Sequence, residues 1–505
     1  MLFEPEPDPL VLELERQQFD KHPGWQQKLN AQCRHSGLHG PQGCSNPVVR
    51  SGRCIAHAPK LTVREKSRLS PEQLAAEQAF EADFVEHMSG LAKIRPSGNY
   101  EWDGVHFCSI EWNQPPWLDL LKRGSFYCGM MVFHQPANFS LITLAHRPLF
   151  DRTVFRDSAT FTGARFSHGG IFKNAHFKGN AHFGSTFEGD LLFSDCTFYD
   201  DVQFSNCTIN GTLSFSNCIF YKKVSFDNSE ITGTLLFSSN GQSDTFCSDF
   251  SFRRVRLGPN SEVRFEMVPL RSATFLWTSL ERIMFWSVSW EIKRTFGLTR
   301  ISRRRVLADE LAIKRGKLGP ELLEPLADNY RQLVLASEKR RDFDASEDFH
   351  IGEMEVRRLL EGSSYRNRFF RTLRNTFNAI SIYRVLSCYG SSYWQAISVF
   401  IGFFILFSTA LLFFGLNVTA EGKEMGLTPI EYSVDTSVLN EARAKQLLHD
   451  WLTASHHCLL VATFQRERLY SPSGIGGYLF QLLASLVLPG QAALMLLAIR
   501  RRFKR

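Results

Sequence analysis

Large apolar residues recur through residues 150–290 at steps that alternate between five and six. Neither an amphipathic helix nor a half-buried strand has that period, so neither is the repeating unit. The repeat combines two interleaved series, each with a period of eleven and one step of ten. The first is Phe155, Phe166, Phe177, Phe187, Phe198, Ile209, Phe220 and Ile231, and the second is Phe161, Phe172, Phe183, Phe193, Phe204, Phe215, Phe226 and Phe237. The step later settles to five, through Leu270, Phe275, Leu280, Phe285 and Trp290.

A smaller residue lies two positions before most of these large ones. Self-similarity of this kind is typical of a solenoid, in which each unit buries its apolar side only against its neighbours. We expect a right-angled coil of four strand-and-turn units per turn, with the large and the small residue of each unit inside. At about 20–22 residues per turn, some six or seven coils form a rod roughly 30 Å long. The small residues are Ala159, Ala164, Ala175, Ala181, Ser185, Cys196, Val202, Cys207, Cys218, Val224 and Ser229, followed by Val268, Ala273, Thr278, Ile283 and Val288.

These units resemble a pentapeptide-repeat solenoid, in the variant where A-x-F-x-x units alternate with units one residue longer. The resemblance covers residues 150–290 and implies a right-handed quadrilateral β-helix. The full chain of 505 residues has room for further modules. We predict a multidomain protein: this solenoid, an α-helical hairpin and a region of two transmembrane helices.

Eleven cysteines are scattered through the chain, and three of them occupy small inward positions of the repeat. A stacked column of Cys196, Cys207 and Cys218 has two readings, a metal site or core packing. We favour packing, because a free cysteine behaves as a small hydrophobe. The N-terminus is acidic and lacks the basic and then apolar start of a signal peptide. We therefore expect a reducing compartment and no disulfide framework.

Residues 1–60 combine an acidic tail with a candidate zinc knuckle. Cys33, Cys44, Cys54 and His57 form a complete tetrahedral Cys₃His set, and only the last two are closely spaced. The set resembles short Cys₃His knuckles of phage-related and plant proteins. Four protein ligands leave no open position, so the metal would be structural zinc. The alternative is a loop in which these residues coincide by chance.

Residues 61–149 are predicted to form a helix followed by a cap for the solenoid. Ser70 is a suitable N-cap and Pro71 a suitable first helical residue. Residues 100–149 are rich in aromatic side chains, which favours an irregular segment that covers the open end of the coil. A ligand pocket in this segment is the alternative.

Residues 291–325 are basic and are followed by a predicted helical hairpin at 326–375. The basic residues have two interpretations that we consider equally, a solvated connector or a surface attracted to anionic lipid headgroups. Binding of nucleic acid is a third and weaker interpretation. Y-R-Q-L at 330–333, R-D-F-D-A-S-E-D-F at 341–349 and G-E-M-E-V-R-R at 352–358 resemble the hairpin that follows the solenoid in bacterial pentapeptide-repeat membrane proteins. The hairpin carboxylates Asp342, Asp344, Glu347 and Glu353 are better explained by intrahelical ion pairs than by an active site.

Two uncharged stretches, 390–420 and 474–499, are long enough to be transmembrane helices. The alternative for each is the core helix of a soluble domain. Lys and Arg are frequent before the first stretch and in the tail 500–505, whereas the loop 421–473 has five basic and seven acidic residues. The positive-inside rule then places both termini in the cytoplasm and the loop outside. We expect a two-span protein of the bacterial inner membrane.

The loop contains an apolar segment at 451–464 that could form a re-entrant helix. Span, re-entrant helix and span is the plan of tetrameric two-span channels, but no T-V-G-Y-G-like filter is present. His456 and His457 could line a pore, although surface histidines are commoner. Enzyme motifs such as G-x-S-x-G, G-x4-G-K-[ST] and H-E-x-x-H are absent from the sequence, so we predict no catalytic residues and no enzyme.

Some soluble pentapeptide-repeat proteins mimic DNA, which requires a strongly acidic rod. Residues 150–290 contain 14 acidic and 13 basic residues, a net charge of −1, which disfavours mimicry. We predict a membrane-anchored scaffold whose rod binds an unidentified protein partner. The alternative is a channel-like protein, tetrameric and regulated by its solenoid. Besides protein, the expected partners are membrane lipid and further copies of the chain, while nucleic acid is disfavoured.

Overall fold

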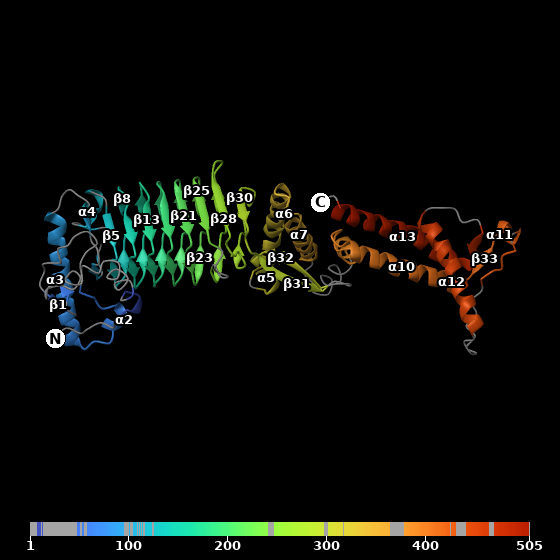
Figure 1. The fold of residues 1–505 in the computed structure, drawn as a ribbon, viewed down its shortest axis with the longest axis horizontal. Helices are drawn as coiled ribbons and strands as arrows, with labels where there is room; N and C mark the ends of the chain where they lie inside the picture. Colours follow the sequence, from blue (N-terminus) through green and yellow to red (C-terminus); the bar gives the residue numbers. More distant parts are fainter. Residues whose placement is uncertain are drawn as a thin grey trace, which may run out of the picture. The chain divides into compact units, whose positions relative to one another are not determined.

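The computed structural model contains two compact units, residues 1–292 with 306–333, and residues 293–305 with 334–505. Figure 1 shows the parallel strands of the first unit and the helices of the second. The structure describes residues 8–11, 13, 48–50, 53–54, 58–94, 100–101, 105–108, 110, 112, 114, 117–123, 126–240, 247–296, 301–316, 318–363, 378–424, 426–430, 441–463 and 469–503.

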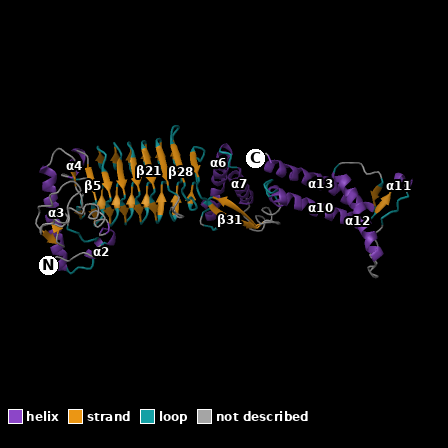
Figure 2. Ribbon diagram, in the orientation of Figure 1, coloured by secondary structure: helices purple, strands orange, loops and turns teal. Residues whose placement is uncertain are grey.

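The first unit is a β-solenoid of about seven coils, with four parallel sheets as its faces (Figure 2). We number the faces in the order in which the chain visits them. The first face comprises β3 (Tyr100–Glu101), β5 (Phe126–Gly129), β9 (Leu149–Asp151), β13 (Gly170–Lys173), β17 (Leu191–Ser194), β21 (Thr212–Ser216), β25 (Thr234–Ser238), β28 (Glu262–Glu266) and β30 (Ile283–Trp286). The second face comprises β4 (His106–Phe107), β6 (Val132–Phe133), β10 (Val154–Phe155), β14 (His176–Phe177), β18 (Thr197–Phe198) and β22 (Ile219–Phe220).

The other two faces complete the prism. The third face comprises β7 (Ala137–Asn138), β11 (Ala159–Thr160), β15 (Ala181–His182), β19 (Val202–Gln203), β23 (Lys223–Ser225), β26 (Asp249–Ser251) and β29 (Ala273–Thr274). The fourth face comprises β8 (Thr143–Leu144), β12 (Arg165–Phe166), β16 (Thr186–Phe187), β20 (Thr208–Ile209), β24 (Glu230–Ile231) and β27 (Arg256–Leu257).

The predicted large residues fill the inside of the coil. All are buried, and those that lie within strands pair in register with the next coil, as Phe155 does with Phe177. The rings stack nearly parallel, with centroids 4.7 Å apart for Phe155 and Phe177 and 4.7 Å for Phe183 and Phe204. Rings on neighbouring faces instead meet edge to face, an arrangement that aromatic quadrupoles favour. The predicted inward ladder is therefore confirmed.

The alternation of five and six has a backbone cause. In most five-residue corners, the residue two positions after the large one has a left-handed backbone, as Asn174 does with φ 52° and Asp195 with φ 55°. The corners from Leu270 to Phe275 and from Leu280 to Phe285 are exceptions. Asn, Asp and Gly are the residues that adopt this conformation most readily. Six-residue corners have one more residue and, apart from Gly169, turn without a positive φ. The single four-residue corner, from Phe183 to Phe187, also lacks one.

The small inward residues satisfy their polar atoms against the preceding coil. The Cys207 thiol donates to the Phe183 carbonyl at 2.7 Å, and the Ser229 hydroxyl donates to the Phe204 carbonyl at 2.6 Å. Burial raises the pKa of Cys207 to about 12, so the thiol stays neutral. Cys196 is buried and Cys218, beside it, is half-buried. The inward position predicted for these cysteines is confirmed for Cys196 and Cys207.

The coil begins earlier than the predicted boundary at residue 150. Strands β5 to β8 form a complete coil before it, and β3 and β4 extend two faces further toward the N-terminus. The large residues of this coil, Phe133, Phe139, Leu144 and Phe150, keep the steps of six and five. Trp112 stacks on Phe139 with centroids 4.9 Å apart. The aromatic segment at 100–149 is therefore part of the coil as well as its cap.

Helices cover the N-terminal end of the coil. Helix α3 (Pro71–Ile94) begins where predicted, with the Gln73 N–H donating to the Ser70 hydroxyl at 3.3 Å. Phe84 of α3 packs edge-on against Phe107 at 5.8 Å. Nearby are α4 (Trp117–Arg123), α2 (Val63–Lys66) and an antiparallel pair, β1 (Val48–Arg50) and β2 (Arg53–Cys54).

The C-terminal end of the coil is closed by α5 (Ala308–Lys314), η2 (Pro320–Leu322) and the start of α6 (Leu323–Lys339). The Phe275 N–H donates to Asp309 at 2.9 Å, and Asn329 of α6 donates to the Phe275 carbonyl at 2.7 Å. Burial raises the pKa of Asp309 to about 6, against the opposing effects of the Phe275 N–H and Arg253. These contacts satisfy backbone groups that the last coil would otherwise leave unpaired.

The predicted basic connector at 291–325 is more structured than expected. It contains the two-stranded sheet of β31 (Glu291–Phe296) and β32 (Ile301–Val306), and then α5. Arg304 is only 2% exposed, and Arg305 lies 3.7 Å from Asp348. Arg304 is therefore buried, whereas Arg305 is half-buried and ion-paired. The expected solvated or lipid-facing position is wrong for Arg304, because the arginine is buried in the helical unit.

The second unit is mainly helical. Helices α6 and α7 (Phe343–Ser363) form the predicted hairpin as far as residue 363, including the ion pair between Glu353 and Arg357 at 2.7 Å, whereas its predicted end at 364–375 lies outside the described residues. The remaining elements are α9 (Ala379–Ser387), α10 (Tyr393–Phe414), β33 (Leu416–Val418), α11 (Ala420–Glu424), α12 (Glu441–Ala462), β34 (Tyr470–Pro472) and α13 (Gly474–Phe503). Helices α10 and α13 are long and apolar enough to cross a membrane.

Candidate interaction surfaces

The four faces of the solenoid differ in the residues that point outward. On the first face the strands alternate between buried and partly exposed residues, so that Ile171 and Leu192 face outward between inward Phe and Leu side chains. The register places these outward residues in one column across adjacent coils. The column consists of Leu149, Ile171, Leu192, Ser214 and Leu236, and Arg264 of β28 follows it in register. Ser214 is buried between its neighbours, so the partly exposed members are aliphatic. We call it the apolar column.

A polar column runs beside the apolar column on the same face. Its middle members are serines at 194, 216 and 238, paired in register. The Ser238 hydroxyl donates to the Ser216 hydroxyl at 3.3 Å. The first face therefore combines a narrow aliphatic stripe with short hydroxyl side chains, a combination that allows close approach by another protein surface.

The third and fourth faces are polar by comparison. The outward residues of the third face include Asn138, Thr160, His182 and Gln203. Those of the fourth include Thr143, Arg165, Thr186, Thr208 and Glu230. Exposed ion pairs such as Arg165 with Glu188 lie at the edge of the fourth face. An aliphatic stripe across several coils thus distinguishes the first face from the third and fourth.

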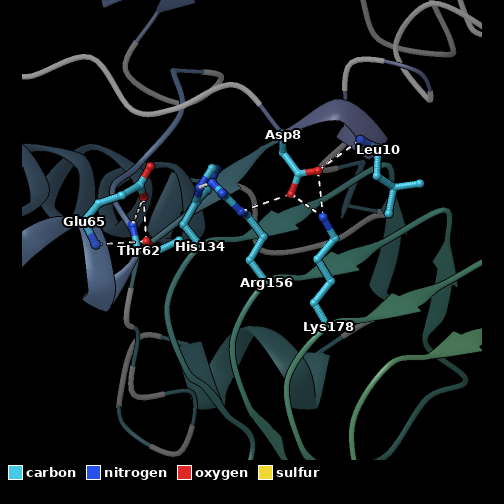
Figure 3. A network of polar contacts seen from close by, with 7 residues as sticks. All are labelled: Asp8, Leu10, Thr62, Glu65, His134, Arg156 and Lys178. Carbon is cyan, nitrogen blue, oxygen red and sulfur yellow. Dashed lines mark hydrogen bonds and ion pairs between the residues drawn. The ribbon is translucent and has the colours of Figure 1, made fainter. Parts of the chain in front are cut away.

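The second face carries a segment from the N-terminus of the chain (Figure 3). Asp8 forms ion pairs with Arg156 at 3.1 Å and Lys178 at 2.6 Å, which come from successive coils. Leu10 and Val11 pack against the outward residues Val132 and Val154. We call residues 8–11 the N-terminal strap.

Asp8 is held as a carboxylate despite being nearly buried. Its side chain is 4% exposed, and it also accepts a hydrogen bond from the Leu10 N–H at 3.0 Å. Burial raises the pKa of Asp8, but the hydrogen bond and charge of Lys178 and the charge of Arg156 outweigh burial and lower it overall. Arg156 also contacts the His134 ring at 3.1 Å, which links the strap to a third coil.

In the second unit, α12 packs against both long apolar helices. Cys458 and Val461 of α12 form one cluster with Phe407 and Leu411 of α10 and with Ala484 and Leu488 of α13. The Trp451 indole N–H donates to Thr409 at 3.3 Å. Because Trp451 and Cys458 are two turns apart and both contact one region of α10, α12 crosses α10 rather than running along it, as Figure 1 shows.

A polar network surrounds the turn between α9 and α10. Cys388, Tyr389 and Gly390 all have positive φ, and the Tyr389 hydroxyl donates to Glu355 of α7 at 3.0 Å. Glu355 also pairs with Arg384 at 3.0 Å. At the end of α13, Arg501 donates to the Tyr389 carbonyl at 3.2 Å. The turn thus joins α7, α9 and α13.

The predicted zinc ligands fall mainly outside the described residues. This is true of Cys33, Cys44 and His57, whereas the backbone of Cys54 lies in β2. Within the described part of the chain, no group of three or more His, Cys, Asp or Glu side chains could hold a metal ion. His456 is exposed and His457 is buried in α12. The N-terminal strap was not predicted, since a contact between residues 170 positions apart leaves no local pattern.

Comparison with known proteins identifies the repeat. Residues 150–197 and 193–239 match the family of pentapeptide repeats (9 copies). No curated protein and no solved structure matches the chain. The match covers less than a fifth of the chain, so it identifies a pentapeptide-repeat β-solenoid domain, followed in the chain by a helical region with two long apolar helices.

Proposed function

We propose that this protein is a non-enzymatic, membrane-anchored scaffold that presents its solenoid to a protein partner. The observation that carries the proposal is the apolar column on the first face. Its aliphatic residues lie in register on β9, β13, β17 and β25, with Ser214 of β21 between the last two, while the third and fourth faces are polar. A rigid sheet bearing such a stripe suits a flat protein surface better than a small substrate.

Membrane anchoring is supported by the surface of the helical unit. Helices α10 and α13 expose many large aliphatic and aromatic side chains, among them Ile401, Phe413 and Leu486. Water disfavours a surface of this kind, whereas lipid solvates it. Under the positive-inside rule, the distribution of Lys and Arg favours cytoplasmic termini, so the solenoid would meet cytoplasmic partners.

The experiment compares the faces within the full chain in detergent. The Ile171→Lys/Leu192→Lys variant places two charges on the apolar column. The Thr186→Lys/Gln203→Lys variant places the same charges on the polar faces and is the matched control. The amount of partner captured should decrease at least tenfold with the first variant, relative to wild type, and should be unchanged with the control. Equal loss with both variants, or capture by neither wild type nor control, contradicts the proposal.

A second candidate function, a channel-like protein of four copies, is favoured by one observation. Helix α12 lies between two long apolar helices in sequence and packs against both of them. Purified protein in lipid vesicles should then conduct ions and form a tetramer by light scattering. If the purified protein is monomeric and conducts no ions, the channel-like function is contradicted and only the scaffold function remains.

We also propose structural zinc at Cys33, Cys44, Cys54 and His57. Elemental analysis of the purified chain should then find one zinc per chain, reduced in the Cys54→Ser variant. A metal-free wild-type protein contradicts this proposal.

A further inference from the structure

The second face is partly covered and partly open along its length. The N-terminal strap covers its first coils, where Val132 and Val154 are buried beneath Leu10 and Val11. Two coils beyond Val154, Tyr199 is 38% exposed, and one coil further on Ile219 and Tyr221 are 41% and 57% exposed; both tyrosines follow strands of this face. Their rings stack 5.2 Å apart. The open part thus continues the surface on which the strap lies.

The strap contacts the face as a ligand would. One carboxylate engages two cations from successive coils, and aliphatic residues two and three positions later fill the adjoining apolar surface. Because the coils are spaced at the ~4.8 Å of paired strands, Arg156 and Lys178 present their charges at a separation that one carboxylate can bridge. This combination of charge and aliphatic contact specifies a short acidic-aliphatic sequence.

The charge pattern also distinguishes this surface from the rest of the rod. Lys222, a lysine near the same edge, is already paired with Asp200 at 2.8 Å. Arg156 and Lys178, in contrast, direct their charges to a residue that is remote in sequence. Without Asp8 these two cations would lie together beside exposed Val132 and Val154. Their mutual repulsion favours any carboxylate that replaces it.

We propose that the second face is a docking site for extended acidic-aliphatic segments of partner proteins, and that the N-terminal strap is its resident intramolecular ligand. A partner segment must displace the strap from the coils of Val132 and Val154. It can then extend onto the ledge of Tyr199, Ile219 and Tyr221. This inference does not depend on the apolar column of the first face, because it concerns a different surface and a different kind of partner.

The strap would act as a competitor at high effective concentration. A tethered ligand has an effective concentration of about millimolar, so a strap with an intrinsic Kd of about 0.1 mM weakens any competing segment about tenfold. Binding of a partner would therefore depend on the state of the N-terminus. Changes that remove the charge of Asp8 or the apolar contact of Val11 should open the site.

The test uses the full chain in detergent and a fluorescent peptide with the sequence of residues 4–15, measured by fluorescence anisotropy. The Asp8→Lys/Val11→Asp variant releases the strap without altering the solenoid. We expect this variant to bind the peptide at least tenfold more tightly than wild type. Adding Lys178→Ala should remove most of that gain, whereas the matched control Lys222→Ala should not. A peptide with Asn at the position of Asp8 should bind weakly.

Two results would overturn the proposal. The first is an opened variant that melts like wild type yet does not bind the peptide, or binds it no better than wild type does. The second is a wild-type dimer that disappears with Asp8→Lys, because the occupant would then be the strap of a second copy. Circular dichroism of each variant separates loss of binding from loss of the fold. A negative result in this test does not affect the proposed function, because that proposal is tested separately by comparing the first face with the third and fourth.

Discussion

The solenoid and the two long apolar helices place the same kinds of side chain in opposite positions. In the solenoid, Phe155, Phe177 and Phe204 are completely buried, and the outside is made mainly of short polar residues. In α10 and α13, less than a quarter of each apolar stretch is buried, and Leu486 is 68% exposed. The solenoid has an apolar core and a polar surface, whereas the two long helices have an apolar surface and bury few of their side chains.

The difference teaches which solvent each region requires. A coil that buries its aromatic rings by stacking gains about 25 cal/mol per Å² of apolar surface removed from water. Helices that leave such surface exposed gain nothing comparable in water, and lipid removes the penalty. The contrast therefore supports the proposed membrane anchor, and mutations that place a charge in each region separate the two cases.

The largest effect is expected for Phe204→Asp in the solenoid. The exchange removes a ring that stacks on Phe183 and Phe226 and places a carboxylate among them. Losing a buried Phe costs about 3–5 kcal/mol, and burying an unpaired charge adds several more. We expect the neighbouring coils to unfold, with loss of β-structure by circular dichroism. Gln203→Asp, at the neighbouring outward position, is the control and should melt like wild type.

How far the sequence predicted this coil depends on the kind of interaction. The spacing of Phe and Ile predicted the inward ladder, because stacking one coil on the next imposes the period directly. The first coil carries the same steps in Phe133, Phe139 and Leu144, so the signal was present but was obscured by the surrounding aromatic residues. Buried Arg304 and the contact of Asp8 with Lys178 could not be predicted, because each depends on residues that only the folded chain brings together.

The second prediction places a charge on the apolar helices. Leu486→Lys in α13 should cost about 2.5–3.5 kcal/mol if the helix centre lies in lipid, and almost nothing if the exposed residue faces water. We expect a clear decrease in the fraction of protein that stays in the membrane pellet after an alkaline wash. Ile219→Lys on the solenoid is the control, with no change expected. If the α13 variant is recovered in the pellet as fully as wild type, the exposed apolar side of α13 does not lie in lipid.

The third prediction concerns pH and the C-terminal end of the coil. Burial raises the pKa of Asp309 to about 6, above its unfolded value of 3.8. The folded state therefore binds a proton that the unfolded state has lost, and stability from this group decreases as the pH rises from about 4 to 6. At 1.36 kcal/mol per pKa unit, the decrease is at most about 3 kcal/mol.

Asp309→Asn removes that proton equilibrium while its amide oxygen can still accept from the Phe275 N–H. We expect the variant to be more stable than wild type at pH 7 and nearly equal to it at pH 4, measured by urea denaturation of the solenoid. Asp227→Asn, a half-buried carboxylate in the middle of the coil, is the comparison. A variant that is less stable than wild type at pH 7 would show that Arg253, 3.8 Å away, stabilises the ionised form instead.

The smallest effect is expected in the polar network of the helical unit. Burial raises the pKa of the Tyr389 phenol and the Glu355 carboxylate adds to the rise, so the hydroxyl stays protonated and donates to Glu355 at 3.0 Å. Tyr389→Phe keeps the ring and removes this bond, while Arg384 and Arg358 still pair with Glu355. The expected loss is about 1–2 kcal/mol, a few degrees in melting temperature in detergent. Tyr393→Phe, at the start of α10, should change the melting temperature less. Equal effects would mean that the network contributes little to holding the turn, and that packing of the Tyr389 ring alone fixes it.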